Sequence, residues 1–194
     1  MSAAPRLGLA LAACATVLPA PAASSPYTDS IETAVFNLCP ALRSGRISPD
    51  NPNELTRLGY FRTPELEEDQ ADAEDGMPYL FTRGRGTGAV TIDYWPYPQY
   101  CSISFGGRQA AAAVARVKAR MAREPRVYRR AAEADWELDG VRHEAWQVVR
   151  RSNMCLAIET PGGTNPNLYS ISYEPLPVIH PGVVRSACAS ATAP

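Results

Sequence analysis

The chain has 194 residues, of which 45% are hydrophobic and 20% are charged. This composition is ordinary for one globular domain. The formal net charge of −1 excludes a strong overall attraction to nucleic acid or to an anionic membrane, so no nucleic-acid partner is expected.

The first 22 residues have the pattern of a secretory signal peptide. Arg6 precedes a short apolar run over 7–18, and an Ala-x-Ala site predicts cleavage after Ala22 or the next residue. The run is shorter than the ~20 apolar residues of a membrane-spanning helix, so no transmembrane helix is expected. Residues 11–14 also resemble a bacterial lipobox. The sequence therefore predicts a periplasmic or secreted protein, with lipid attachment through Cys14 as the alternative.

Four cysteines follow the predicted signal peptide: Cys39, Cys101, Cys155 and Cys188. In an exported chain they are expected to form two disulfides, for which three pairings exist. None lies in a Cys-x-x-Cys motif, so neither a metal site nor a redox motif is expected. We predict that Cys39–Cys101 joins a helix to the central sheet and that Cys155–Cys188 ties the tail to a late strand.

Two helices are predicted ahead of the sheet. Asp29 and Glu32 have the spacing of a capping box, and apolar residues follow at helical spacing. A first helix is therefore expected over about 30–39, ended or kinked by Pro40. Residues 51–54 have a cap, a proline and a glutamate at the spacing that predicts a second, short helix.

The segment from 65 to 83 changes from acidic to apolar. Seven acidic residues and no basic residue lie between 65 and 75, which predicts a solvated loop. The run lacks the EF-hand pattern, so a calcium site is not predicted. Residues 79–81 predict a strand, and the glycine-rich stretch 84–88 leads into another strand. Because no helix follows these glycines, a turn is a better interpretation than a phosphate-binding loop.

The centre of the domain is predicted between residues 88 and 123. Apolar residues alternate over 88–95 and again over 101–105, which is typical of half-buried strands. The prolines at 96–98 predict a turn between them. From 110 to 121 the apolar period changes to that of an amphipathic helix. Two strands and a helix with matched apolar faces predict the nucleus of a sheet-plus-helix domain.

The rest of the chain predicts antiparallel strands. One strand is expected near the end of 126–138, and Asp139-Gly140 is a strong hairpin signal. Later strands are predicted at 141–150, 154–158 and 168–173. The whole is an α+β domain over 23–174, with an antiparallel sheet of about five to six strands, about three helices mainly on one face, and two disulfides. An irregular tail rich in proline and alanine is expected over 175–194.

No catalytic signature is present. The two histidines, His143 and His180, have no partners at metal-ligand spacing, and no Gly-x-Ser-x-Gly motif occurs. No cofactor or metal is expected, and the sequence favours a non-catalytic role. A hydrolase with a site dispersed around His143 is the alternative, although His143 is expected at the surface or at a sheet edge.

The strongest binding signal is a basic segment. Between residues 108 and 130 there are eight basic residues and one acidic residue. Two interpretations need no ligand: cations complement the helix C-terminus, or the acidic run 65–75 covers them. The functional interpretation is a binding module for an anionic cell-envelope component or an acidic protein, through Arg116, Arg120 and Arg123. The aromatic turn with Trp95 and Tyr97 is a second candidate surface.

Overall fold

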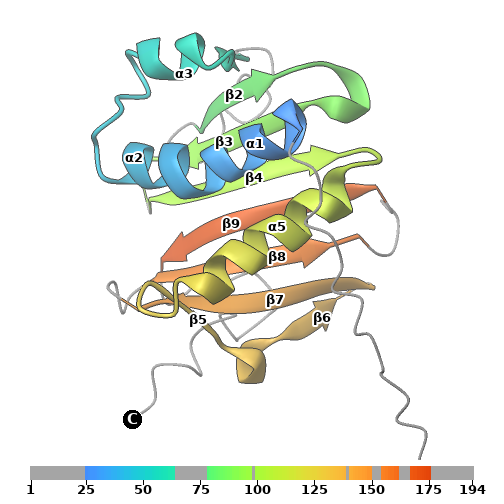
Figure 1. Cartoon of the computed structure of the whole chain (residues 1–194). Coiled ribbons are helices and arrows are strands. Elements are labelled where there is room, and N and C mark those ends of the chain that lie inside the picture. The colour runs from blue at the N-terminus through green and yellow to red at the C-terminus, as the bar shows by residue number, and fades with distance from the viewer. Residues whose placement is uncertain are drawn as a thin grey trace, which may run out of the picture.

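The computed structural model describes residues 25–63, 78–97, 99–138, 140–149, 154–161 and 167–175. They form one antiparallel sheet with its main helices on one face, so the predicted α+β class is confirmed (Figure 1). The helical elements are α1 (Pro26–Thr33), the π-helical turn η1 (Ala34–Leu38), α2 (Cys39–Arg43), α3 (Asn53–Arg57), the 3-10 turn η2 (Gly86–Gly88), α5 (Ala110–Arg123) and the 3-10 turn η3 (Ala132–Ala134). The strands are β1 (Phe61–Arg62), β2 (Tyr79–Arg83), β3 (Val90–Trp95), β4 (Tyr100–Gly106), β5 (Tyr128–Arg130), β6 (Trp136–Leu138), β7 (Val141–Val148), β8 (Met154–Thr160) and β9 (Leu168–Pro175).

The described strands number nine, more than the five to six predicted. Their order is β1-β2-β3-β4-β9-β8-β7-β5, and β6 pairs with β7 beyond the end of β5. The segment 126–138 holds two short strands, β5 and β6, where one was predicted. Strands of two or three residues, such as β1 and β5, are too short to show an alternating pattern, which is why the count was wrong.

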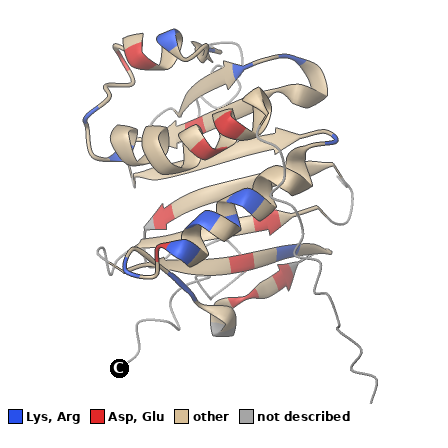
Figure 2. Ribbon diagram, in the orientation of Figure 1, with Lys and Arg blue, Asp and Glu red and all other residues tan. Residues whose placement is uncertain are grey.

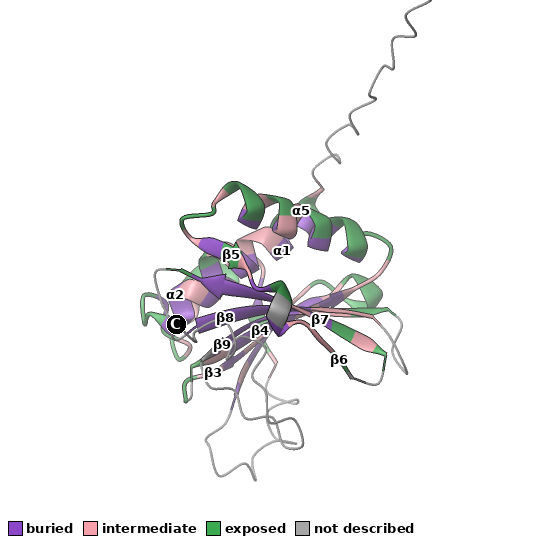
Figure 3. Cartoon of the chain, turned by 90° about the horizontal axis from the view of Figure 1, so that it is seen from below, coloured by how far each residue is buried: buried purple, intermediate pink, exposed green. Residues whose placement is uncertain are grey.

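The two faces of the sheet differ sharply in chemistry. On the apolar face, which packs against α1 and α5, one cross-strand row consists of Phe81, Ile92, Ile103, Ile171 and Ile158, all fully buried (Figure 3). Because side chains alternate along each strand, the intervening residues form the opposite face, here called the polar face. Its longest row has the polar residues Thr82, Thr91, Ser104, Ser170, Glu159 and His143 between an aromatic residue at each end, Phe61 and Trp136.

The N-terminal helix begins earlier than predicted and continues past Pro40. Ser25 caps α1 in a reciprocal arrangement with Thr28, so Asp29 is not the cap. The chain then passes through η1 into α2, and Pro40 lies in the first turn of α2. In a continuous α-helix the proline ring would clash with the carbonyl four residues earlier, and the wider π turn directly precedes it. Pro40 therefore reshapes the helix without ending it.

The predicted bridge between Cys39 and Cys101 is confirmed. It joins α2 to β4, and both residues are fully buried, with 5.8 Å between their Cα atoms. Cys155 is also fully buried, in β8, but Cys188 lies outside the described residues, so the Cys155–Cys188 pairing stays a prediction. The signal peptide, the acidic run 65–75 and the tail after residue 175 also lie outside the described part.

Candidate functional site

The basic segment lies on the outer side of α5 and in the connection to β5 (Figure 2). The helix buries a stripe consisting of Ala110, Ala113, Val114, Val117 and Met121. This spacing turns the charged positions away from the sheet. Whether these cations are available to a ligand therefore depends on the acids that surround them.

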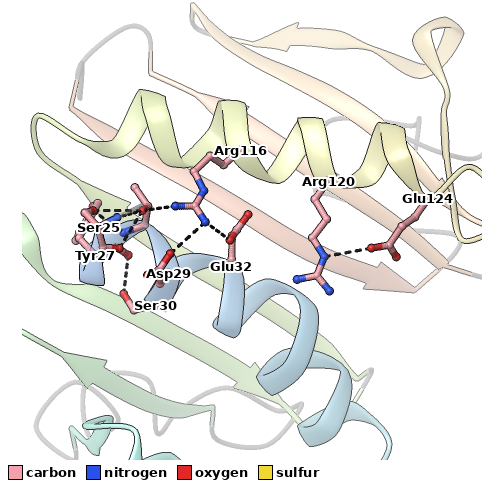
Figure 4. Close-up of polar contacts among 9 residues, drawn as sticks. Ser25, Tyr27, Asp29, Ser30, Glu32, Arg116, Arg120 and Glu124 are labelled. Carbon is pink, nitrogen blue, oxygen red and sulfur yellow. Dashed lines mark hydrogen bonds and ion pairs between the residues drawn. The ribbon is translucent and has the colours of Figure 1, made fainter. Parts of the chain in front are cut away.

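Arg116 is neutralised by α1. Its Nη2 atom lies 2.6 Å from Glu32 Oε2 and 3.1 Å from Asp29 Oδ1, and its Nη1 donates to the hydroxyl of Thr28 (Figure 4). The two acids predicted to form a capping box thus bind an arginine of another helix. Because α1 and α5 pack side by side, these contacts tie the two helices together.

Three more cations of the segment are paired within the fold. Lys118 contacts Glu144 of β7, and Arg120 lies 3.2 Å from Glu124 and over the ring of Phe36. Arg130 binds Asp135. The acids that compensate the helix come from α1, β7 and the residues after α5, and all of these lie within the described part of the chain.

Asp135 is held in its charged form by this pairing. Partial burial alone would raise the pKa of this carboxyl. Hydrogen bonds from Arg130 and from the Ala145 amide, with the charges of Arg130 and Arg142, outweigh burial and lower the pKa below its ordinary value. The Arg130–Asp135 pair therefore fixes the turn between β5 and β6 to β7.

The connection from α5 to β5 carries cations of a different kind. Arg123, Arg126 and Arg129, here called the α5–β5 arginines, are exposed and have no acidic partner among the described residues. Arg129 donates to the neutral amide of Gln147. Val149 is 43% exposed beside them, and its amide donates to the Val127 carbonyl. Arg108, at the other end of α5, is likewise exposed.

The three arginines predicted from the sequence to bind a ligand therefore lie in different environments. It places Arg116 and Arg120 in ion pairs and leaves Arg123 exposed. Arg126 and Arg129 belong to the same basic segment but were not selected. Arg116 is paired because α1 packs against α5, and no local sequence pattern reports that contact. The Arg120–Glu124 pair, by contrast, has the i, i+4 spacing that the sequence shows.

The aromatic turn does not form one exposed cluster. Tyr97 is 73% exposed, whereas Tyr94 is buried in the core. Trp95 is half-buried on the polar face, where its side chain hydrogen-bonds to Asp93. Of the two residues predicted to bind a ligand here, only Tyr97 is fully exposed.

Half-buried acidic and phenolic groups lie together on the polar face. Burial raises the pKa of Asp93, and the hydrogen bond to Trp95 opposes this only partly. Asp93 Oδ1 is buried, and no described residue hydrogen-bonds to it. Burial also raises the pKa of Tyr100, and the negative charges of Glu174, Glu159 and Asp93 raise it further. These groups favour their protonated forms at the expense of their charged forms.

His143 is buried, which corrects the expectation of a surface residue. It is only 7% exposed, stacks on Trp136 with 3.4 Å between the ring centroids, and places Nδ1 3.3 Å from Glu159 Oε1. Ser170 lies opposite Glu159, one strand further away, so it is about 9–10 Å from His143. Within the described residues no hydroxyl hydrogen-bonds to this histidine, and no nucleophile–base pair is formed.

Wider comparisons give no further assignment. No family model, curated protein or solved structure matches the chain. In the described ranges, no group of three or more histidine, cysteine, aspartate and glutamate side chains is placed to hold a metal ion. None of the described helices has the length and apolar character needed to cross a membrane.

Proposed function

We propose that the protein is an exported, non-catalytic binding module that holds an anionic surface of the cell envelope through the α5–β5 arginines. One observation carries the proposal. The fold neutralises Arg116, Lys118, Arg120 and Arg130 with its own acids. It leaves Arg123, Arg126 and Arg129 exposed without an acidic partner in the described part of the chain.

Arg123 lies in the last turn of α5, where its charge complements the helix dipole. Arg126 and Arg129 lie beyond the helix, gain nothing from that dipole and add like charge, so the positive charge here exceeds what the fold needs. Arginine is suited to phosphate because its planar guanidinium donates two parallel hydrogen bonds. The exposed Val149 side chain beside the arginines adds apolar contact of the kind that supports binding at a lipid interface. These features favour a surface of lipid phosphates over an acidic protein, which would be expected to need a larger apolar contact.

Export is supported by the buried Cys39–Cys101 disulfide, because such bridges persist mainly in oxidising compartments. Mass spectrometry of the mature N-terminus distinguishes the two routes. Cleavage after Ala22 or Ala23 indicates plain secretion to the periplasm or medium, and a diacylated Cys14 indicates a lipoprotein. Peptide mapping without reduction tests the expected Cys155–Cys188 bridge in the same sample.

The binding proposal is tested with vesicles that contain about one third phosphatidylglycerol, compared with neutral phosphatidylcholine vesicles. The mature protein is expected to co-sediment with the anionic vesicles only, and less so at high salt. The Arg123→Gln, Arg126→Gln, Arg129→Gln triple variant is expected to bind at least about tenfold more weakly, since each arginine near such a surface contributes about 1 kcal/mol.

The control is a triple variant with the same change in net charge at exposed arginines elsewhere, Arg46→Gln, Arg57→Gln and Arg85→Gln. It is expected to retain binding. Equal loss of vesicle binding in both variants would show that binding depends only on net charge, and it would contradict the proposed site. Retention on immobilised polyglutamate but not on vesicles, lost in the first variant alone, would identify an acidic protein as the partner.

A further inference from the structure

A separate pocket lies on the polar face, at the edge of the sheet where β3 and β9 begin and β4 ends. It has a volume of about 270 Å³ and is bounded by the η2 turn, the start of β3, the end of β4 and the residues that begin β9. The α5–β5 arginines lie at and after the C-terminal end of α5, whereas Gly106 and Gly107 precede its N-terminal end. The pocket is therefore independent of the proposed arginine site.

The hollow exists because small residues occupy the end of the sheet. Gly106 pairs with Leu168 across β4 and β9, and it has no side chain to fill the space between them. A Cβ atom on Gly106 would lie 2.7 Å from the Asn167 carbonyl oxygen. Gly107 has φ +86°, and a Cβ atom there would lie 2.8 Å from the Thr87 carbonyl oxygen. Close backbone approach therefore fixes the walls of the pocket.

The lining carries no charge, and it combines a few polar groups with a larger share of apolar surface. Hydroxyl groups come from Thr87, Thr91 and Ser104, and an amide comes from Asn167. The Thr91 hydroxyl is shared with Thr82 at 3.3 Å, whereas the Ser104 hydroxyl has no hydrogen-bond partner in the described residues. Thr91 and Ser104 are paired across β3 and β4, so both are held on rigid strands.

Apolar surface completes the pocket. Leu168 lines it and is 47% exposed, and Ala89 lies at the start of β3. A ligand with hydroxyl groups at its edges and C–H groups on its faces matches this mixture. An anion would find no cation among the lining residues, and a purely apolar ligand would leave the hydroxyls unpaired. The volume lies just below the range of about 300–1,000 Å³ for drug-sized ligands, which suits a single ring.

We propose that this pocket binds a neutral pyranose sugar ring, with Ser104, Thr91 and Asn167 as hydrogen-bonding groups and Leu168 against the ring face. The ligand lies at the rim of the sheet and needs no movement of the backbone to enter. Thr91 and Ser104 are interior members of the cross-strand row that continues to Ser170, so the sugar lies against the middle of that row.

The test is a titration of the full mature protein with glucose and with N-acetylglucosamine, followed by amide chemical shifts in ¹⁵N spectra. At least one sugar is expected to give saturable shifts at Thr87, Ser104, Asn167 and Leu168, while sodium phosphate gives none there. Ser104→Ala is expected to weaken binding about five- to tenfold, the usual effect of one lost hydrogen bond.

The matched control is Ser170→Ala, which removes the next hydroxyl of the same row but lies outside the pocket. It is expected to bind as the wild type does, and its spectrum shows whether the fold is retained. The triple variant of the α5–β5 arginines is also expected to keep sugar binding. No saturable shift with either sugar, shifts with phosphate instead, or equal weakening by Ser104→Ala and Ser170→Ala would overturn the proposal.

Discussion

The two faces of the sheet bury their side chains with different kinds of contact. Ile171 and Ser172 are neighbours on β9, and both are fully buried. Ile171 lies in the row of apolar side chains that packs under the helices. The Ser172 hydroxyl lies on the polar face and donates to Glu174 Oε1 at 2.8 Å. Two side chains that are equally buried can therefore contribute different amounts to the free energy of unfolding, depending on the face they occupy.

On the apolar face each side chain removes hydrocarbon from water, a contribution of about 1.5–3 kcal/mol for a fully buried aliphatic residue. On the polar face a hydrogen bond replaces one made to water, and its net contribution is about 0.5–1.5 kcal/mol. The apolar face therefore contributes most of the stability, and a smaller apolar cluster that includes Ala145, Cys155 and Trp136 adds to it on the polar face. The polar face, with its hydroxyls, buried acids and the pocket at its end, is free to carry a binding role.

The largest expected effect is the difference in stability between a variant of Ile171 and a variant of its neighbour Ser172. Ile171→Ala is expected to lower the free energy of unfolding by about 2–5 kcal/mol, because it removes buried hydrocarbon and leaves a cavity. Ser172→Ala is expected to cost only about 1 kcal/mol, the contribution of its hydrogen bond to Glu174. Urea denaturation of the oxidised protein measures both values. Equal costs would show that the polar face is as important for stability as the core.

A smaller effect is expected at Asp135, which joins the β5–β6 connection to Arg130. Its lowered pKa stabilises the folded state above the unfolded-state value of 3.8, and this stabilisation is lost as the pH falls through the folded-state pKa. Asp135→Asn is therefore expected to cost about 1–2 kcal/mol at neutral pH and progressively less in acid. Urea midpoints between about pH 7 and pH 2 measure this difference.

The control for Asp135 is Glu54→Gln, at an exposed acid of α3 for which the described residues contain no ion pair. This substitution is expected to change stability by less than about 0.5 kcal/mol at any pH. A cost for Asp135→Asn that stays constant with pH would mean that the carboxylate charge is not what Arg130 recognises.

Much of the fold could be predicted because its signals are local. The alternation of Val90 and Ile92 identified β3, and the hairpin that pairs Leu138 with Val141 was indicated by its turn residues. Pro40 was predicted to end or kink the first helix, and it does not end it: the chain continues through a π turn, which leaves no pattern in the sequence. The short strands β1 and β5 form because longer neighbours pair with them.

The candidate sites could be predicted only in outline. The basic segment was visible, but the acids that neutralise Arg116 belong to α1, more than eighty residues earlier. The pocket is built from Thr91, Ser104 and Asn167, which three separate segments bring together. The glycines at 106 and 107 carry no sequence signal of a pocket, and only the structure shows which atoms a side chain there would meet. Long-range contacts of this kind have no local signal.

The smallest expected change in stability is a gain, and it comes from a substitution of Asp93 on the polar face. Burial raises the pKa of Asp93 above its ordinary value of 3.8, so its ionised form destabilises the folded state as the pH rises through that range. Asp93→Asn keeps an acceptor for Trp95 and removes the buried charge. The variant is therefore expected to be more stable than the wild type at neutral pH, by up to about 1 kcal/mol. The gain should disappear in acid, whereas acid removes a cost for Asp135→Asn, so the same urea series separates the two carboxylates. A loss of stability at neutral pH would show that the unpartnered Oδ1 atom is in fact well solvated.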